Sequence, residues 1–303
     1  MHFARTEEQV ELAAAVRGLL GKRSDSEAVR AAMVSDAGYD TALWQTLCEQ
    51  IGVAALVVPE EYDGIGASLV ETAVVLEELG EFLTPAPLLA TALHTCQVRL
   101  HGSEAEKADL LPRLAAGEVF PFALGDVVLE PESGAGSMDQ TLRLAVSDQA
   151  ADTPEDVRAI STALSSALQV GAMQRALDMT VRYSKERVQF GRAIGSFQAL
   201  KHRMADMLVL LEASRSASWG ATAVAAAYLD VPDDDSREHL LRLAAIAGSY
   251  CSDALDRIAS EMVQLHGGIA ITWEHDAHLV FKRAHALSQL NGPAHRHRET
   301  LLD

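Results

Sequence analysis

The stretch Glu186-Arg-Val-Gln-Phe-Gly191, followed by Ser196-Phe-Gln-Ala-Leu-Lys201, lies between two long segments whose apolar residues have helical spacing. It places an arginine, an aromatic ring and a glutamine at the junction of two helices. A guanidinium can donate two hydrogen bonds to phosphate oxygens, and an aromatic ring offers a flat apolar surface. The junction therefore predicts a site for the pyrophosphate and the flat ring of a dinucleotide.

Long helices are expected on both sides of this junction. Four segments keep apolar residues at three- and four-residue intervals, as one buried helix face requires. Short loops between such segments predict an antiparallel four-helix bundle. The segments cover residues 160–185, 197–229, 236–265 and 274–290.

The N-terminal part of the chain predicts shorter helices broken by turns. Thr6 opens a capping pattern followed by apolar residues at helical spacing. A proline and two glycines mark residues 59–66 as a loop. Further helices are expected over 39–51, 68–83 and 105–116.

The middle of the chain differs from both neighbours. Residues 130–137 are polar and turn-rich, whereas residues 141–146 alternate as a strand does. One or two strands fit here, but a full barrel does not. We therefore divide the chain into an N-terminal helical domain (1–125), a vestigial β segment or linker (126–158) and a C-terminal four-helix bundle (159–303).

Composition limits the classes of function. Of 303 residues, 49% are apolar and only 5% aromatic, which favours helices packed on helices. The formal net charge of −18 argues against nucleic acid and anionic membrane surfaces as partners. No apolar run reaches the roughly 18 residues of a membrane span, and no signal peptide is visible. We expect a soluble cytoplasmic protein.

No metal site is expected. The cysteines Cys48, Cys96 and Cys251 are widely spaced and predict packed, reduced thiols. Several histidines gather near the C-terminus, but their spacing fits no common zinc pattern. They are His266, His275, His278, His285, His295 and His297.

Three segments, in this order along the chain, resemble the acyl-CoA dehydrogenase family. Val58-Pro-Glu-Glu-Tyr-Asp-Gly-Ile-Gly66 is similar to a helix-connecting loop, with Asp63 where a glycine is usual. The stretch that begins at Glu186 resembles the family's FAD-binding signature. Gln264-Leu-His-Gly-Gly-Ile-Ala-Ile-Thr272 is similar to its second flavin-contacting loop. The resemblance to this family extends over nearly the whole chain.

The resemblance implies specific cofactor contacts. In that family the two signature segments bind the ADP portion of the FAD in the neighbouring subunit. Arg187 would then pair with the pyrophosphate, and other residues would surround the adenosine end. These are Phe190 and Gln198, with Gln264, Gly267 and Gly268 closing over it.

Ordinary structural roles remain open for the same residues. Arg187 could be a helix-end arginine paired with a nearby acid. Phe190 could be a core residue, and Gly267-Gly268 could be a helix cap and turn.

The catalytic base is the first departure from the family. A carboxylate there takes the α-proton of an acyl-CoA thioester, while the β-hydrogen leaves as hydride to the flavin. Asn291 stands at the usual position of that carboxylate, and an amide cannot take up the proton. A minority of the family places the base on the first bundle helix. Ser161 and Thr162 occupy that region here, and neither can replace it. Glu155 and Asp156 lie upstream with no assigned role.

The middle part is the second departure. The family's β-barrel shields the isoalloxazine ring, but residues 126–158 are far too few for it. Trp44, Trp219 and Trp273 all lie outside this part, so no tryptophan-bearing flavin strand is visible. The resemblance therefore implies a mostly α fold, with an N-terminal helical domain and a four-helix bundle, and with the barrel largely missing.

These departures lead to a hypothesis of function. The chain resembles the short non-catalytic subunit of actinobacterial α2β2 steroid-type acyl-CoA dehydrogenases. That resemblance implies a fuller dehydrogenase subunit as partner and one FAD per heterodimer. It also implies an acyl-CoA or steroid-CoA thioester as substrate, cholesterol catabolism as the setting and an electron-transfer flavoprotein as acceptor.

Two other classes of function stay open. One is a self-sufficient homodimeric dehydrogenase with an unrecognised base. The other is a flavin-free helical scaffold or binding protein.

Overall fold

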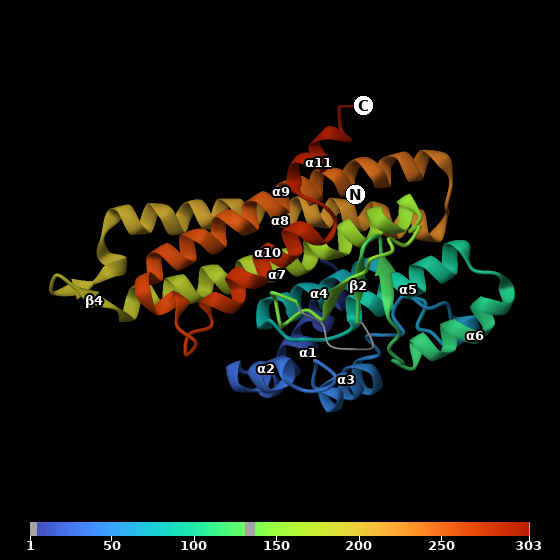
Figure 1. Cartoon of the computed structure of the whole chain (residues 1–303), viewed down its shortest axis with the longest axis horizontal. Coiled ribbons are helices and arrows are strands. Elements are labelled where there is room, and N and C mark those ends of the chain that lie inside the picture. The colour runs from blue at the N-terminus through green and yellow to red at the C-terminus, as the bar shows by residue number, and fades with distance from the viewer. Residues whose placement is uncertain (1–4, 131–136, 303) are drawn as a thin grey trace.

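The computed structural model describes residues 5–130 and 137–302, and Figure 1 shows a long helical bundle flanked by shorter helices. The bundle consists of α7 to α10, which lie side by side along the longest axis. The mostly α architecture predicted from the sequence is confirmed. The bundle helices are α7 (Glu155–Glu186), α8 (Gln198–Asp230), α9 (Asp234–His266) and α10 (Ala277–Leu290).

The bundle helices end where local sequence stops them. Asp233 caps α9, because its carboxylate accepts a hydrogen bond from the backbone N–H of Ser236. Gly267 ends the same helix with a φ of 64°, which a residue with a Cβ rarely adopts. A short terminal helix, α11 (Ala294–Glu299), then packs against α9.

The shorter helices form the N-terminal half of the molecule. The expected capping box is present at Thr6, whose hydroxyl accepts from the backbone N–H of Gln9. A capping box also starts α4 at Ser68, as that segment's helical pattern predicted. These helices are α1 (Glu7–Arg23), α2 (Ser26–Met33), α3 (Thr41–Thr46), α4 (Leu69–Phe82), α5 (Leu88–His101) and α6 (Glu104–Ala115).

Helix α5 was not predicted. Most of its residues from Leu88 to Val98 are buried, so the sequence shows no alternation between an apolar and a polar face. The helix begins directly after Pro87, a residue that is readily accommodated at a helix start. Burial on several sides leaves α5 without the one-sided pattern of an amphipathic helix, and the short helices α2 and α11 were not predicted either.

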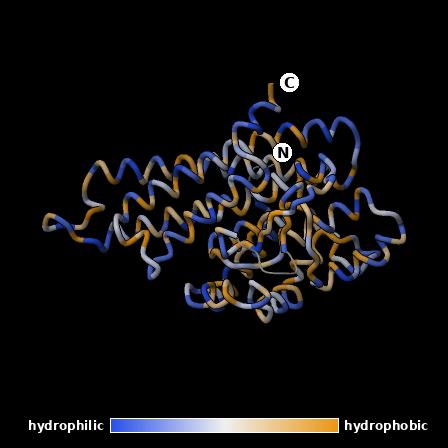
Figure 2. Tube along the Cα trace, viewed as in Figure 1, coloured by the Kyte–Doolittle hydropathy of each residue, from blue (hydrophilic) through white to orange (hydrophobic). Residues whose placement is uncertain are grey.

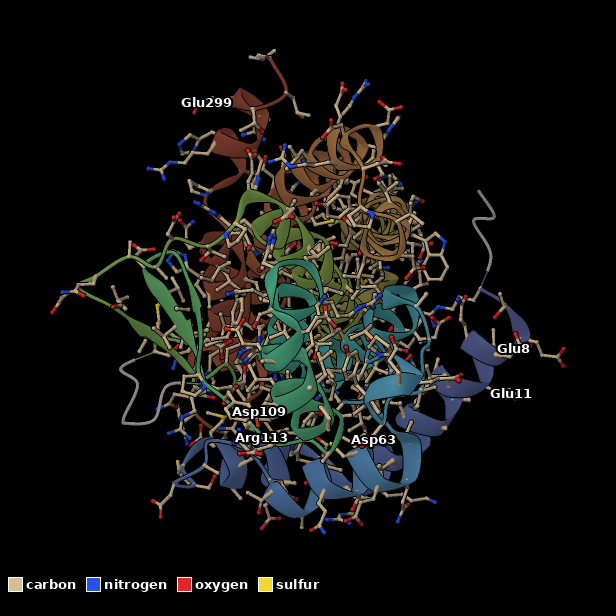
Figure 3. The ribbon with its side chains drawn as sticks, turned by 90° about the vertical axis from the view of Figure 1, so that its right-hand side faces the viewer. Glu8, Glu11, Asp63, Asp109, Arg113 and Glu299 are labelled. Carbon is tan, nitrogen blue, oxygen red and sulfur yellow. The ribbon has the colours of Figure 1, made fainter. Side chains whose placement is uncertain are left out.

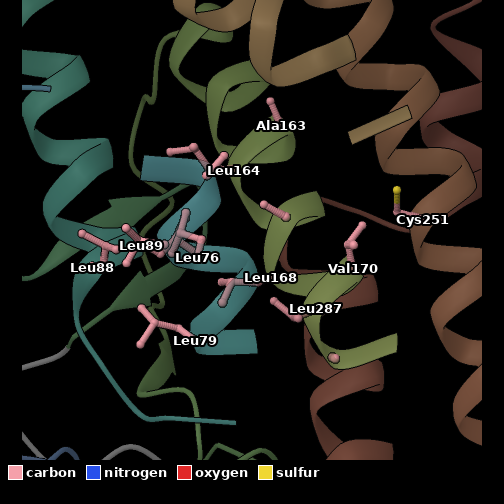
Figure 4. Close-up of a cluster of buried hydrophobic side chains, with 14 of the residues drawn as sticks. Leu76, Leu79, Leu88, Leu89, Ala163, Leu164, Leu168, Val170, Cys251 and Leu287 are labelled. Carbon is pink, nitrogen blue, oxygen red and sulfur yellow. The ribbon is translucent and has the colours of Figure 1, made fainter. Parts of the chain in front are cut away.

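Close packing of α4 on α7 joins the two halves of the molecule. A Cβ at Gly171 would lie 2.0 Å from the carbonyl oxygen of Glu77, and one at Gly80 would lie 2.4 Å from that of Leu168. Only glycines allow the two backbones to approach so closely. Figure 4 shows the apolar side chains around this contact, which come from α4, α5, α7, α9 and α10.

The middle segment forms a small antiparallel sheet. Its strands are β1 (Phe122–Leu124), β2 (Val127–Leu129) and β3 (Leu144–Val146), in the order β1-β2-β3. The expectation of one or two strands was therefore too low, and the sheet begins before residue 126. Three-residue strands are too short to show a clear alternation. Most of the predicted polar turn, residues 131–136, lies outside the described residues.

A buried ion pair fastens this segment to α10. The Nε of Arg283 lies 2.8 Å from Oδ2 of Asp139, and both side chains are 0% exposed. The hydroxyl and carbonyl oxygens of Thr141 accept further hydrogen bonds from the same guanidinium. The shortened middle segment is thus held against the bundle by a charged contact.

The surface is strongly charged. Figure 3 shows charged side chains pointing outward, among them Glu8, Glu11 and Asp109. Figure 2 shows hydrophobic and hydrophilic residues alternating along the helices, as one-sided burial requires. Within residues 5–130 and 137–302, no helix is both long and apolar enough to cross a membrane.

Candidate functional site

A tight hairpin follows α7 at the predicted signature. The backbone N–H of Arg187 donates to the carbonyl oxygen of Tyr183 at 2.8 Å, which closes the last helical turn. Strands β4 (Val188–Gln189) and β5 (Arg192–Ala193) then pair, and Phe190 and Gly191 join them with φ values of 52° and 78°. Positive φ at both central residues is the conformation of a type I′ turn.

Phe190 is placed for an external contact. Its side chain is 91% exposed, so it is not a core residue. A bulky residue with positive φ is uncommon and marks a constrained position. An exposed ring at the tip of a hairpin is well suited to contact a ligand or a second chain.

The polar residues of the signature are also accessible. Arg187 and Gln198 are both exposed. Across the described parts of the chain, no carboxylate forms an ion pair with Arg187, so it is not a helix-end arginine paired with an acid. The Gln198 amide lies 2.8 Å from the His202 ring nitrogen. These groups remain available to an anionic, planar ligand.

The glycine loop follows the end of α9 and forms the short 3-10 helix η4 (Gly267–Ile271). Gln264, Gly267 and Gly268 are exposed. A Cβ at Gly268 would meet no atom within 4 Å, so packing inside this chain does not require a glycine there. The loop presents open backbone that a ligand can approach closely.

Both signature segments lie at the same end of the bundle, at the left of Figure 1. The rings of Tyr183 and His266 stack with their centroids 4.5 Å apart. Tyr183 is one turn before Arg187, and His266 directly precedes Gly267. The structure therefore brings together the two segments that sequence analysis assigned to one ligand.

Two neutral imidazoles, those of His266 and His275, lie at the end of the bundle that carries the signature segments. Burial lowers the pKa of His266 and that of His275. The His266 Nδ1 lies 2.8 Å from the carbonyl oxygen of Met262, so this nitrogen carries the proton and donates it. The two rings are 4.8 Å apart. Across the described residues, no group of three or more His, Cys, Asp or Glu side chains could hold a metal ion.

Asn291, the first expected base position, contacts α7 one helical turn from Ser161, the second expected position. The Asn291 amide donates from Nδ2 to the Ser165 hydroxyl of α7 at 3.0 Å. Ser161, one turn earlier on α7, is fully buried. Asn291 and Thr162 line a cavity of about 510 Å³ between α7, α9 and α11, and Glu155 lies on its wall. Neither expected position carries a carboxylate.

Asp156, the neighbour of Glu155, has a structural role. Burial alone would raise its pKa, but hydrogen bonds from Tyr228 at 2.7 Å and His101 at 3.0 Å hold the pKa below its usual range. The carboxylate is therefore ionised and its oxygens already have partners. It ties the start of α7 to α5 and α8.

Comparison with known sequence families finds two matching regions in the chain. Residues 6–118 match the family described as "Acyl-CoA dehydrogenase, N-terminal domain", and residues 160–303 match "Acyl-CoA dehydrogenase, C-terminal domain". This chain belongs to the acyl-CoA dehydrogenase family. It is 44% identical to acyl-CoA dehydrogenase IpdE2 of Mycolicibacterium smegmatis, over 95% of this chain and 96% of that protein.

Solved acyl-CoA dehydrogenase structures share the fold. The ChsE4-ChsE5 complex from Mycobacterium tuberculosis superposes with a TM-score of 0.79 at 22% identity, over 99% of this chain and 98% of that one. A variant of the Tcur3481-Tcur3483 steroid ACAD gives a TM-score of 0.78, also at 22% identity, over 98% and 97%. The similarity extends along the whole chain.

Acyl-CoA dehydrogenases use FAD, and the end of the bundle suits its ADP half. An unpaired guanidinium, an exposed ring and an open glycine loop are the groups that a pyrophosphate and an adenine require. Arg187 would face the pyrophosphate, while Phe190 and Gln198 would flank the adenosine. All of these groups are exposed.

Sequence reasoning missed three residues that organise these regions. Tyr183 and His266 connect the two signature segments, and Ser165 is the partner of Asn291. Tyr183 belongs to an ordinary helical pattern, and His266 was named only among the C-terminal histidines that match no zinc pattern, although it is 3% exposed. Contacts between distant segments leave no local pattern from which they could be found.

Glu155→Gln tests whether the cavity beside Asn291 holds a hidden base. The Glu155 carboxylate is 64% exposed and lies 2.5 Å from Arg237. We expect the substitution to change the turnover of a CoA thioester by less than about twofold, because exposed ion pairs contribute little. A loss of roughly 10²-fold or more, as removal of a general base causes, would instead identify Glu155 as that base. Asp253→Asn, which removes an exposed carboxylate paired with Arg298, is the matched control.

Proposed function

We propose that this chain is the non-catalytic subunit of a heteromeric, FAD-dependent acyl-CoA dehydrogenase. It would complete the FAD site of a fuller dehydrogenase subunit and lack a base of its own. The observation that carries the proposal is the residue type at the two family base positions. Asn291 has an amide that donates to Ser165, and Ser161, one turn earlier on α7, has a buried hydroxyl, so neither position offers a carboxylate.

The proposal assigns separate tasks to the three segments of the chain. Residues 159–303 would supply the ADP contacts through Arg187, Phe190, Gln198, Gln264, Gly267 and Gly268. Residues 126–158 form too little sheet to enclose a flavin ring, so the partner would provide that enclosure and the proton acceptor. FAD, when bound, takes the hydride in α,β-desaturation. Residues 1–125 would support the bundle through the packing of α4 on α7.

The relatives support a substrate class. The name of the Tcur3481-Tcur3483 protein, a steroid ACAD, supports a steroid substrate. The name of the ChsE4-ChsE5 complex supports an assembly of two different subunits. We propose a steroid-CoA thioester, as in cholesterol catabolism, as substrate and an α2β2 heterotetramer as the assembly. An electron-transfer flavoprotein would accept the electrons.

Flavin stoichiometry tests the proposal directly. The chain is purified alone and after co-expression with a fuller dehydrogenase encoded beside it, and FAD is measured by absorbance after release. We expect a colourless lone chain and one FAD per heterodimer, because the ADP contacts are exposed and the ring-enclosing barrel is missing. A yellow, active lone chain would favour the homodimeric enzyme. A colourless complex would favour the flavin-free scaffold.

A further inference from the structure

A cluster of three aromatic rings, of which two are stacked, joins the two segments proposed to bind FAD. Tyr183 stacks on His266 at 4.5 Å with an interplanar angle of 22°. The His275 ring lies 4.8 Å from that of His266 and 6.4 Å from that of Tyr183. The three rings come from the end of α7, the end of α9 and the loop before α10. No step in the proposed function uses them.

The first ring belongs to the residue that closes the arginine turn. The backbone carbonyl oxygen of Tyr183 accepts the backbone N–H of Arg187, so a shift of Tyr183 would shift the turn that carries the guanidinium. The second ring belongs to His266, which immediately precedes Gly267 of the glycine loop. His266 is also fixed along α9 by its hydrogen bond to Met262.

The third ring is anchored on the far side of the loop. The His275 Nδ1 accepts the backbone N–H of Ala277 at 3.1 Å. Its neighbour Asp276 accepts hydrogen bonds from Ser26 and Arg30 of α2 and from Arg175 of α7. The loop is therefore held at both ends, while Gly267 and Gly268 between them are exposed. A loop fixed in this way loses little conformational freedom when a ligand binds.

We propose that Tyr183, His266 and His275 are positioning residues that hold the glycine loop and the Arg187 turn at a fixed separation, so that both contact the same ADP group. This inference rests on the proposed function. It assigns the rings a role in FAD affinity without contact with FAD. Chemistry at the flavin would be unaffected once FAD is bound.

The test compares Tyr183→Leu with Tyr183→Phe in the co-expressed complex. No hydrogen bond of the Tyr183 hydroxyl occurs among the described residues, so phenylalanine keeps the stack and leucine removes it. We expect Tyr183→Leu to raise the FAD dissociation constant roughly two- to tenfold, as the loss of an aromatic pair implies. Turnover at saturating FAD should match the parent complex, and Tyr183→Phe should bind FAD normally.

His275→Asn provides a second route if Tyr183→Leu fails to assemble. Asparagine keeps an acceptor for the backbone N–H of Ala277 but removes the ring, and we expect FAD to bind more weakly. Arg187→Ala serves as the reference in the same titration. If the ring variants bind FAD normally while Arg187→Ala binds it more weakly, the positioning role is wrong but the proposed function stands. Normal affinity in Arg187→Ala would instead contradict the proposed function.

Discussion

Replacing Arg187 by alanine in the co-expressed complex is expected to raise the FAD dissociation constant roughly 10- to 150-fold, the factor that corresponds to a charge-assisted hydrogen bond of about 1.5–3 kcal/mol. The guanidinium is exposed and has no ion-pair partner among the described residues, so no internal contact is lost. The measurement is a fluorescence titration of the flavin-free complex with FAD.

Two further variants make this result specific. Arg187→Lys keeps the charge but loses the planar pair of donors, so it should fall between the parent and alanine. Arg182→Ala removes an equal charge from an exposed position earlier on α7 and should leave FAD affinity nearly unchanged. Equal weakening by both alanine variants would indicate a general effect of charge. An unchanged affinity in Arg187→Ala would remove the main support for a shared FAD site.

Arg283→Met is expected to lower the free energy of unfolding by about 3–5 kcal/mol, because it leaves the carboxylate of Asp139 buried without its counter-charge. Both side chains are 0% exposed and their atoms lie 2.8 Å apart. Methionine has a similar length and is tolerated in cores, so the loss should come chiefly from the unpaired charge. Urea denaturation followed by circular dichroism measures the change.

Arg113→Met is the matched control for this prediction. Arg113 forms an ion pair with Glu118 in which both side chains are exposed, and its removal should change the urea midpoint little. Replacing both members of the buried pair by apolar residues should recover part of the loss, because no charge is then left unpaired. A loss with Arg283→Met no larger than that of the control would show that the middle segment is not fastened by this pair.

Local sequence patterns were sufficient for most helices of this protein. The capping residue Thr6 identified a helix start, because a side-chain oxygen there satisfies backbone N–H groups whatever the tertiary surroundings. Apolar spacing found α8, α9 and α10, which keep an exposed face, and also α7, although its residues 159–173 are all buried. The same reasoning missed α2 and α5, and it missed strands only three residues long.

The sequence by itself determined the family signature, the amide at Asn291 and the shortness of the middle segment, because each is a matter of residue type, order and length. Only the tertiary structure decided that the Asn291 amide meets Ser165, that Arg283 pairs with Asp139 and that Tyr183 stacks on His266. These contacts join segments far apart in the chain. Their geometry is set by how whole helices pack. The periodicity of one helix shows which face is buried, but it does not show which residue of another helix will contact that face.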